Sequence, residues 1–164
     1  MKKIIALVFI SLSFFSCEKD DICTEATTPR IVMEFYDISN PANLKNVVNL
    51  KIIAEGQATE LGTYNGVSKI YLPLKVTDDV TKYSLKLNNT SDINANEDKL
   101  EFNYTRQNVY VSRACGYKTI FKLNDSNGTL LTDNTTPDGF WIQNLVISNS
   151  NIINENETHI KIYF

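Results

Sequence analysis

The stretch Leu100-Glu101-Phe102-Asn103-Tyr104-Thr105 alternates apolar and polar side chains with a period of two. Successive side chains of a β-strand point to opposite faces, so this stretch predicts a strand with one buried face and one exposed face. The same alternation recurs at residues 31–36, 48–52, 69–74, 83–87, 109–112, 117–123, 140–147 and 159–164. No window of eleven or more residues after the N-terminal segment has a helical stripe, so we expect about nine strands and an all-β fold.

Polar stretches separate the predicted strands at residues 40–46, 90–98, 124–128 and 132–139, and they are rich in turn-forming residues. Of these, residues 124–128 are expected to form a hairpin turn. Short strands and frequent turns predict an antiparallel β-sandwich of eight or nine strands, Ig-like or similar, with a small β-barrel as the alternative. Pro73 lacks a ladder donor, which places its strand at an edge or a bulge.

The last predicted strand has Ile160, Ile162 and Phe164 on one face, which should dock in the core. A chain of 164 residues is long enough for one domain. Its 16 basic and 19 acidic residues give a net charge of −3, which argues against nucleic acid as a partner. No nucleotide-binding, zinc-protease or nucleophile-elbow motif occurs, so we predict no catalytic residue, no metal and no cofactor.

The N-terminus resembles a bacterial lipoprotein signal. Two lysines precede an apolar run over residues 4–15, which is about 18 Å long as a helix and too short for a membrane core of about 30 Å. Ser16 directly precedes Cys17, as in a lipobox, although Phe14 and Phe15 depart from the usual pattern. The alternative is a plain signal peptide with an accidental cysteine. We therefore expect a signal peptide at 1–16, a lipidated tether at 17–28 and a single β domain at 29–164.

After Cys17, the residues Lys19, Asp20 and Asp21 look like the surface-export signal of lipoproteins in Bacteroidota. A generic polar tether is the competing interpretation. Several acyl chains on one cysteine anchor a protein stably. The expected location is the cell outer membrane, with the chain lipid-anchored and exposed at the cell surface.

The two remaining cysteines, Cys23 and Cys115, form an even pair in an exported chain, which favours a disulfide. Their Cα atoms should then lie about 4.4–6.8 Å apart. The bond would bring Arg30 and Arg113 into one neighbourhood. A redox-active or metal-binding thiol pair is the alternative, although no C-x-x-C spacing is present.

Arg113 alternates with Val111 and Cys115, which indicates an inward position. Burial of a guanidinium requires a partner, so Arg113 would pair with an acid such as Glu34 or Glu101, or line a pocket for an anionic ligand. Simple exposure is the third possibility.

Three further patterns have an ordinary structural explanation beside a functional one. Five aromatic residues could stack on a glycan but more often serve as core or cross-strand pairs: Tyr104, Tyr110, Tyr117, Phe140 and Trp141. Residues 92–98 carry oxygen ligands at every second position, as calcium loops do, yet Glu97 replaces the required glycine. His159 opens the last strand, but no nucleophile is evident beside it.

Three stretches together resemble a family of uncharacterised lipoproteins of Bacteroidota that contain a domain of unknown function. They are Asp21-Ile22-Cys23-Thr24-Glu25 with Thr28-Pro29-Arg30, then Phe102-Asn103-Tyr104, then Tyr110-Val111-Ser112-Arg113-Ala114-Cys115-Gly116. The resemblance implies lipidation at Cys17 and the company of an outer-membrane β-barrel protein, and it implies no activity or cofactor.

Two functions remain open on the sequence. The first is a non-catalytic binding or structural module of the cell envelope, held at the membrane by its lipid. The second is a surface carbohydrate-binding or hydrolytic protein with an unidentified acidic pair, because glycoside hydrolysis needs two carboxylates in a cleft.

Overall fold

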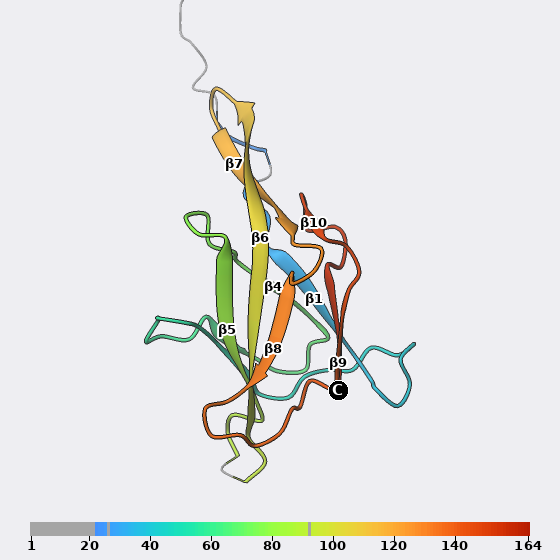
Figure 1. Ribbon diagram of the computed structural model, residues 1–164. Helices are drawn as coiled ribbons and strands as arrows, with labels where there is room; N and C mark the ends of the chain where they lie inside the picture. The colour runs from blue at the N-terminus through green and yellow to red at the C-terminus, as the bar shows by residue number, and fades with distance from the viewer. Residues whose placement is uncertain (1–21, 26, 92) are drawn as a thin grey trace, which may run out of the picture.

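The computed structural model describes residues 22–25, 27–91 and 93–164 (Figure 1). Within these ranges the chain forms eleven β-strands and no helix. The strands are β1 (Ile31–Tyr36), β2 (Leu50–Ala54), β3 (Gly62–Tyr64), β4 (Lys69–Leu72), β5 (Val80–Leu87), β6 (Asn96–Ser112), β7 (Gly116–Leu123), β8 (Thr129–Asp133), β9 (Asn144–Ile147), β10 (Asn151–Ile152) and β11 (Ile160–Tyr163). The expected signal peptide, Cys17 and the export residues Lys19, Asp20 and Asp21 lie outside the described residues.

The strands build two sheets, which confirms the predicted β-sandwich. One sheet has four strands in the order β4-β1-β11-β9, and the other has seven, in the order β10-β7-β6-β5-β2-β3 with β8 beside β6. The two sheets are separate and do not close on each other, so the alternative of a small barrel is wrong.

Alternation along the strands forms the core between the sheets. In β6, Leu100, Phe102 and Tyr104 are buried, whereas the intervening Glu101 and Asn103 are partly exposed. The four-stranded sheet contributes Ile31, Met33, Phe35, Ile70, Leu72, Ile160 and Ile162, and the seven-stranded sheet contributes Leu50, Ile52, Tyr83, Leu85, Leu100, Phe102, Tyr104, Phe121, Leu123 and Ile152. Burial of this apolar surface is the main favourable contribution to folding.

Strand β6 is 17 residues long and joins two strands that the sequence predicted separately. Its first half pairs with β5 over Asn96 to Asn103, and its second half pairs with β7 from Tyr104 onward. Figure 1 shows β6 running through the molecule and the end of the β6–β7 hairpin extending beyond the rest of the two sheets. The second half therefore has no opposing sheet at its far end: residues 105–108 and Tyr110 are exposed, and the remaining residues up to Ser112 are half-buried.

Residues 124–128 do not form the hairpin turn that we expected. Both β7 and β8 are antiparallel to β6, so β8 continues in the direction of β7 after a short excursion. The backbone of Asn103 fixes this arrangement, because it bonds Asn124 on one side of the excursion and Gly128 on the other, each at 3.0 Å. The side-chain amide of Asn103 also donates to the carbonyl of Asn127. A contact from the distant strand β6 thus overrides the local preference for a hairpin turn.

The last strand lies inside the four-stranded sheet, between β1 and β9. Ile160 and Ile162 are buried, and the ring of Phe164 makes edge contacts with Phe35 and Trp141, so the predicted docking of this face is confirmed. The pairing of β1 with β11 is parallel, which the expectation of an antiparallel sandwich did not include. Strand β4 is an edge strand that ends directly before Pro73, as the missing donor of that proline requires.

Several predicted boundaries are wrong. Val48 is exposed, and β2 begins only after Asn49, whose positive φ of 47° interrupts the extended backbone. Strand β9 begins at Asn144, although the preceding Trp141 and Ile142 are buried. Strands β3, β8 and β10 were not predicted, because strands of two to five residues are too short to show a clear alternation.

Gly128 gives a test of the excursion between β7 and β8. A Cβ atom at this position would lie 2.5 Å from the backbone oxygen of Asn124, and backbone atoms cannot move aside cheaply. Gly128→Ala should therefore lower the free energy of unfolding by about 1–3 kcal/mol, measured by chemical denaturation. Gly62→Ala is the matched control, since its nearest contact would be an ordinary 3.7 Å from Tyr64. Equal stability of the two variants would contradict this account.

Candidate functional site

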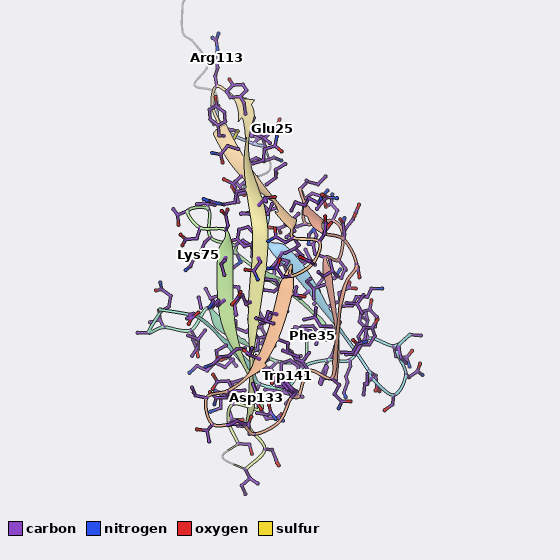
Figure 2. All side chains as sticks on the ribbon, in the orientation of Figure 1. Glu25, Phe35, Lys75, Arg113, Asp133 and Trp141 are labelled. Carbon is purple, nitrogen blue, oxygen red and sulfur yellow. A yellow bond between two sulfur atoms is a disulfide. The ribbon has the colours of Figure 1, made fainter. Side chains whose placement is uncertain are left out.

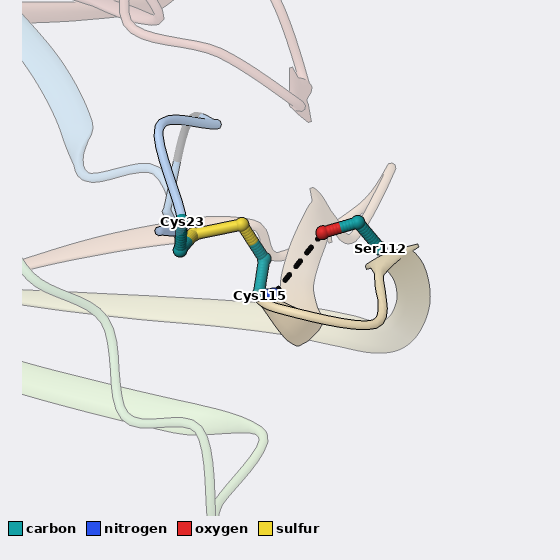
Figure 3. The surroundings of a disulfide bond; sticks show 3 residues. All are labelled: Cys23, Ser112 and Cys115. Atoms are coloured by element: carbon teal, nitrogen blue, oxygen red, sulfur yellow. Dashed lines mark hydrogen bonds between the residues drawn. A yellow bond between two sulfur atoms is a disulfide. The ribbon is translucent and has the colours of Figure 1, made fainter. Parts of the chain in front are cut away.

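The far end of the β6–β7 hairpin is joined to the N-terminal segment by a disulfide (Figure 3). Cys23 and Cys115 are bonded with their Cα atoms 4.9 Å apart, so the predicted pairing and spacing are confirmed. The backbone N–H of Cys115 donates to Ser112 Oγ at 3.1 Å, which closes the turn of the hairpin. Gly116 follows with a φ of 67°, in the left-handed region that glycine adopts without steric cost.

The residues before β1 lie against this hairpin. The backbone N–H of Thr119 donates to Thr28 Oγ1 at 3.0 Å, and the adjacent Pro29 is buried. The segment from Cys23 to Thr28 was expected to be part of the tether. It is instead attached to the folded domain at both ends, by the disulfide of Cys23 and by the hydrogen bond to Thr28.

We call residues 109–118 the distal arm. Tyr110 and Tyr117 face each other across its two strands with ring centroids 5.4 Å apart, and they are 54% and 70% exposed. Arg113 lies exposed at the turn, and Figure 2 shows it at the extreme end of the molecule with Glu25 close to the same end. The arm thus presents two aromatic rings and a guanidinium to its surroundings.

The inward position expected for Arg113 is therefore wrong. Its alternation with Val111 and Cys115 breaks at the turn, because residues 113–115 lie between β6 and β7 and no longer follow the strand register. The two acids that we considered as its partners are bound elsewhere, Glu34 to Lys69 at 2.7 Å and Glu101 to Lys82 at 3.1 Å.

Arg30 belongs to a different cluster, so the disulfide does not join the two arginines in one site. The Arg30 side chain makes a two-pronged contact with the carboxylate of Glu155, at 2.9 and 2.7 Å, and its guanidinium lies 4.9 Å from the centre of the Tyr71 ring. The hydrogen bond from Arg30 is the main cause that lowers the pKa of Glu155. This pair attaches the loop between β10 and β11 to the start of β1.

His159 has a structural role. Its Nδ1 accepts a hydrogen bond from the Val32 backbone N–H at 2.9 Å, while its own backbone N–H donates to the Val32 carbonyl at 3.0 Å. The ring is 1% exposed, and burial lowers its pKa. The buried ring extends the pairing of β1 with the C-terminal strand, and it is held away from solvent and from any substrate.

A depression of about 320 Å³ lies where β2, β5 and β6 meet, and both charged and apolar residues line it. We call it the polar depression after its charged side chains. Glu55 and Glu101 both contact the ammonium of Lys82 there, at 3.8 and 3.1 Å. The pKa of Glu101 is lowered, chiefly by a hydrogen bond from Asn103 and also by Lys82. This is an acidic pair in a concave region, but Glu101 is held in its ionised form, which is unsuited to protonating a leaving group.

Asp98 is the described acid with the strongest upward shift in its pKa. It is fully buried, its Oδ2 accepts a hydrogen bond from the Ile142 backbone at 2.8 Å, and its Oδ1 has no hydrogen-bond partner among the described residues. Burial raises its pKa to about 6, and the nearby charge of Asp133 adds to this rise. Asp98 thus holds the strand β6 to the segment that crosses between the sheets.

In the suspected calcium loop, the carboxylates of Glu97 and Asp98 do not converge on one point. Glu97 accepts a hydrogen bond from Ser84, whereas the next residue, Asp98, points into the interior toward Ile142. Asp92 lies outside the described residues. Over residues 22–25, 27–91 and 93–164, no three His, Cys, Asp or Glu side chains are grouped to hold a metal ion. In the same ranges no helix is long and apolar enough to cross a membrane.

The five aromatic candidates divide by exposure. Tyr104 and Trp141 are core residues, the latter donating from its indole to the Leu85 carbonyl at 3.0 Å, whereas Phe140 is 51% exposed. Tyr110 and Tyr117 form a cross-strand pair, which is one of the two ordinary roles expected for these aromatic residues. The cluster of Glu55, Lys82 and Glu101 left no signal in the sequence, because three separate segments supply it.

Removal of the disulfide should destabilise the domain without unfolding it. The bond closes a separation of 92 residues, and cross-links of this kind typically contribute about 2–4 kcal/mol. We expect the free energy of unfolding of the Cys23→Ser, Cys115→Ser double variant to fall by that amount, measured by denaturation. Ser112→Ala, which removes only the hydrogen bond at the turn, is the control. An unchanged free energy in the double variant would contradict the stabilising role.

Asp98 predicts a stability that depends on pH. An ordinary aspartate has a pKa of 3.8, so the folded state binds more protons than the unfolded state between this value and about 6. The contribution of Asp98 is therefore complete below pH 3.8 and is lost as the pH rises through about 6. Asp98→Asn keeps the acceptor for Ile142 and removes the charge, so it should gain up to about 3 kcal/mol over the wild type between pH 4 and pH 7.

The difference between the two denaturation curves isolates Asp98, because His159 is common to both proteins. Burial lowers the pKa of His159, so its contribution runs the other way and is lost as the pH falls below 6.5. Asp125→Asn removes an exposed carboxylate and controls for the change in net charge. A difference curve that is flat from pH 4 to pH 7 would show that Asp98 does not titrate as described.

Comparison with known proteins identifies a family and no activity. No curated protein and no solved structure matches the chain. A family model described as a family of unknown function, DUF6452, matches residues 49–164, which include strands β2 to β11. The matched part is more than half of the chain, and the chain therefore belongs to the DUF6452 family.

Proposed function

We propose that this chain is a lipoprotein of Bacteroidota, cleaved before Cys17, acylated there and exported to the outer surface of the outer membrane. In this proposal the β-sandwich is a non-catalytic binding or structural module of the cell envelope. Lys19, Asp20 and Asp21 direct the export. The partner is another envelope component, either an outer-membrane β-barrel protein or a glycan.

The disulfide is the observation that carries this proposal. Disulfides persist in oxidising compartments and are rare in the cytosol, so the pairing of Cys23 with Cys115 supports an exported chain. It also leaves Cys17 as the one cysteine of the sequence for acylation. An attached start of the domain, close behind Cys17, suits a protein that is held to a membrane by its N-terminus.

The polar groups of the described residues favour a non-catalytic role. His159 is engaged by the backbone of Val32 and is buried. In the polar depression, Lys82 is shared by Glu55 and Glu101, and a carboxylate held ionised serves recognition better than acid catalysis. The depression therefore favours a polar ligand or partner over a hydrolytic reaction.

Acylation predicts a specific labelling pattern. Cells fed labelled palmitate should incorporate label into the wild-type protein and into Cys23→Ala, and should lose it completely in Cys17→Ala. Cys23→Ala is the matched control because it also removes one cysteine but leaves the acceptor in place. Label that persists in Cys17→Ala would overturn the lipoprotein proposal.

Surface exposure is measured separately in the same cells, by protease digestion. Protease added to intact cells should digest the wild-type protein, and replacement of Lys19, Asp20 and Asp21 by alanine should protect it until the cells are lysed. A wild-type protein that survives protease in intact cells would contradict surface exposure and leave acylation untouched.

The alternative function, carbohydrate binding or hydrolysis at the surface, rests on the acidic pair in the depression. Glu101→Gln would abolish hydrolysis of envelope glycans if the pair were catalytic. Activity lost in this variant, with the fold intact, would replace the non-catalytic proposal.

A further inference from the structure

We propose that the distal arm, residues 109–118, is a contact surface for the lipid–water interface of the membrane. This inference rests on the acylation of Cys17 proposed above and adds an orientation to it. The arm lies against the lipid headgroups, and the remainder of the sandwich points away from the membrane.

Only a short length of chain joins the proposed anchor at Cys17 to the arm. Cys23 is six residues beyond Cys17, and a fully extended chain over six residues spans at most about 21 Å. Cys23 is bonded to Cys115, which lies in the turn of the arm. An acyl chain on Cys17 therefore keeps the turn of the arm within that distance of the bilayer.

The arm presents side chains that suit a membrane interface. Tyrosine is enriched at membrane interfaces because its ring is apolar and its hydroxyl is polar. Tyr110 and Tyr117 are largely exposed and form a pair on the arm. Isolated exposed tyrosines are ordinary, but this pair lies at the end of the domain that the disulfide holds nearest to the anchor.

The charges of the arm fit the same surface. Arg113 is exposed at the turn and Lys118 lies one residue beyond Tyr117, so the arm carries two cations beside its aromatic pair. Glu25 is also exposed near this end and offsets one of them. Long cationic side chains reach the headgroup region while their alkyl parts remain in apolar surroundings.

The arm also projects from the described part of the molecule. Figure 2 places Arg113 at one end and Asp133 and Trp141 toward the opposite end, and Figure 1 shows the arm projecting beyond the rest of the two sheets. Because the arm projects, it can contact a flat membrane while the two sheets stay clear of that membrane. The polar depression with Glu55 and Lys82 lies on the sheets and not on the arm, so it remains available to a soluble ligand.

Fluorescence quenching in vesicles tests the orientation. The acylated full-length protein, purified from cells, is reconstituted into phosphatidylethanolamine–phosphatidylglycerol vesicles with and without brominated phospholipid. Tyr117→Trp reports on the arm. Leu44→Trp is the control, because Leu44 is also exposed, at 55%, and pairs with Tyr36 at the other end of β1. The wild-type protein gives the background of the buried Trp141.

We expect brominated lipid to quench the added emission of Tyr117→Trp and to leave that of Leu44→Trp unchanged. The emission of Tyr117→Trp should also shift to shorter wavelength when vesicles replace detergent-free buffer. Equal emission of Tyr117→Trp in both kinds of vesicle would overturn the proposal.

Mass spectrometry of the N-terminal peptide from the same preparation shows whether Cys17 is acylated. It thus distinguishes failure of the membrane contact from failure of the lipoprotein proposal. An acylated Cys17 without quenching at position 117 overturns the membrane contact and leaves the lipoprotein proposal standing. An unmodified Cys17 overturns both. A photo-crosslinker at position 117 that attaches in whole cells to a protein instead of lipid would assign the arm to a protein partner, again against the proposal.

Discussion

Strand β6 has hydrogen-bonded neighbours along most of its 17 residues, with one register shift between Tyr110 and Ser112, and this ladder places the other elements of the larger sheet. Buried backbone N–H and C=O groups must find partners, so the buried first half of β6 needs a neighbouring strand on both sides. β5 and β8 are these two neighbours, whereas the more exposed second half pairs with β7 on one side. At Asn103, the neighbour on one side of β6 changes from β8 to β7. The end of the second half of β6 belongs to the distal arm.

The sequence predicts the parts of this fold that follow from local alternation. Leu100, Phe102 and Tyr104 are buried as their period of two indicates, and the face formed by Ile160 and Ile162 docks as expected. Pairings between distant strands leave no comparable signal. The parallel neighbour of β1 and the excursion between β7 and β8 depend on contacts across more than twenty residues, and the strand that spans residues 96–112 appeared as two because its apolar alternation stops where the opposing sheet ends.

The candidate site shows the same division. The disulfide was predictable because a chain that is expected to be exported, with two cysteines besides Cys17, allows few alternatives. The orientation of Arg113 was not, since a turn cancels the register on which the inference depended. Buried polar groups were also beyond prediction: His159 and Asp98 each bond a backbone N–H supplied by a distant segment, at Val32 and Ile142. Neither of these hydrogen bonds has a counterpart in the sequence next to His159 or Asp98.

The cross-link between Cys23 and Cys115 also determines how the domain responds to mechanical force. A pull on the chain ahead of Cys23 divides between the peptide route to β1 and the sulfur bridge to the turn between β6 and β7. Tension that enters at this turn pulls both strands in the same direction, so it loads in shear the hydrogen bonds that join β6 to β5 and β8, and β7 to β10. If the chain is anchored at the cell surface as proposed, drag would thus load its longest strand, and β1 with its parallel neighbour would bear only the remainder.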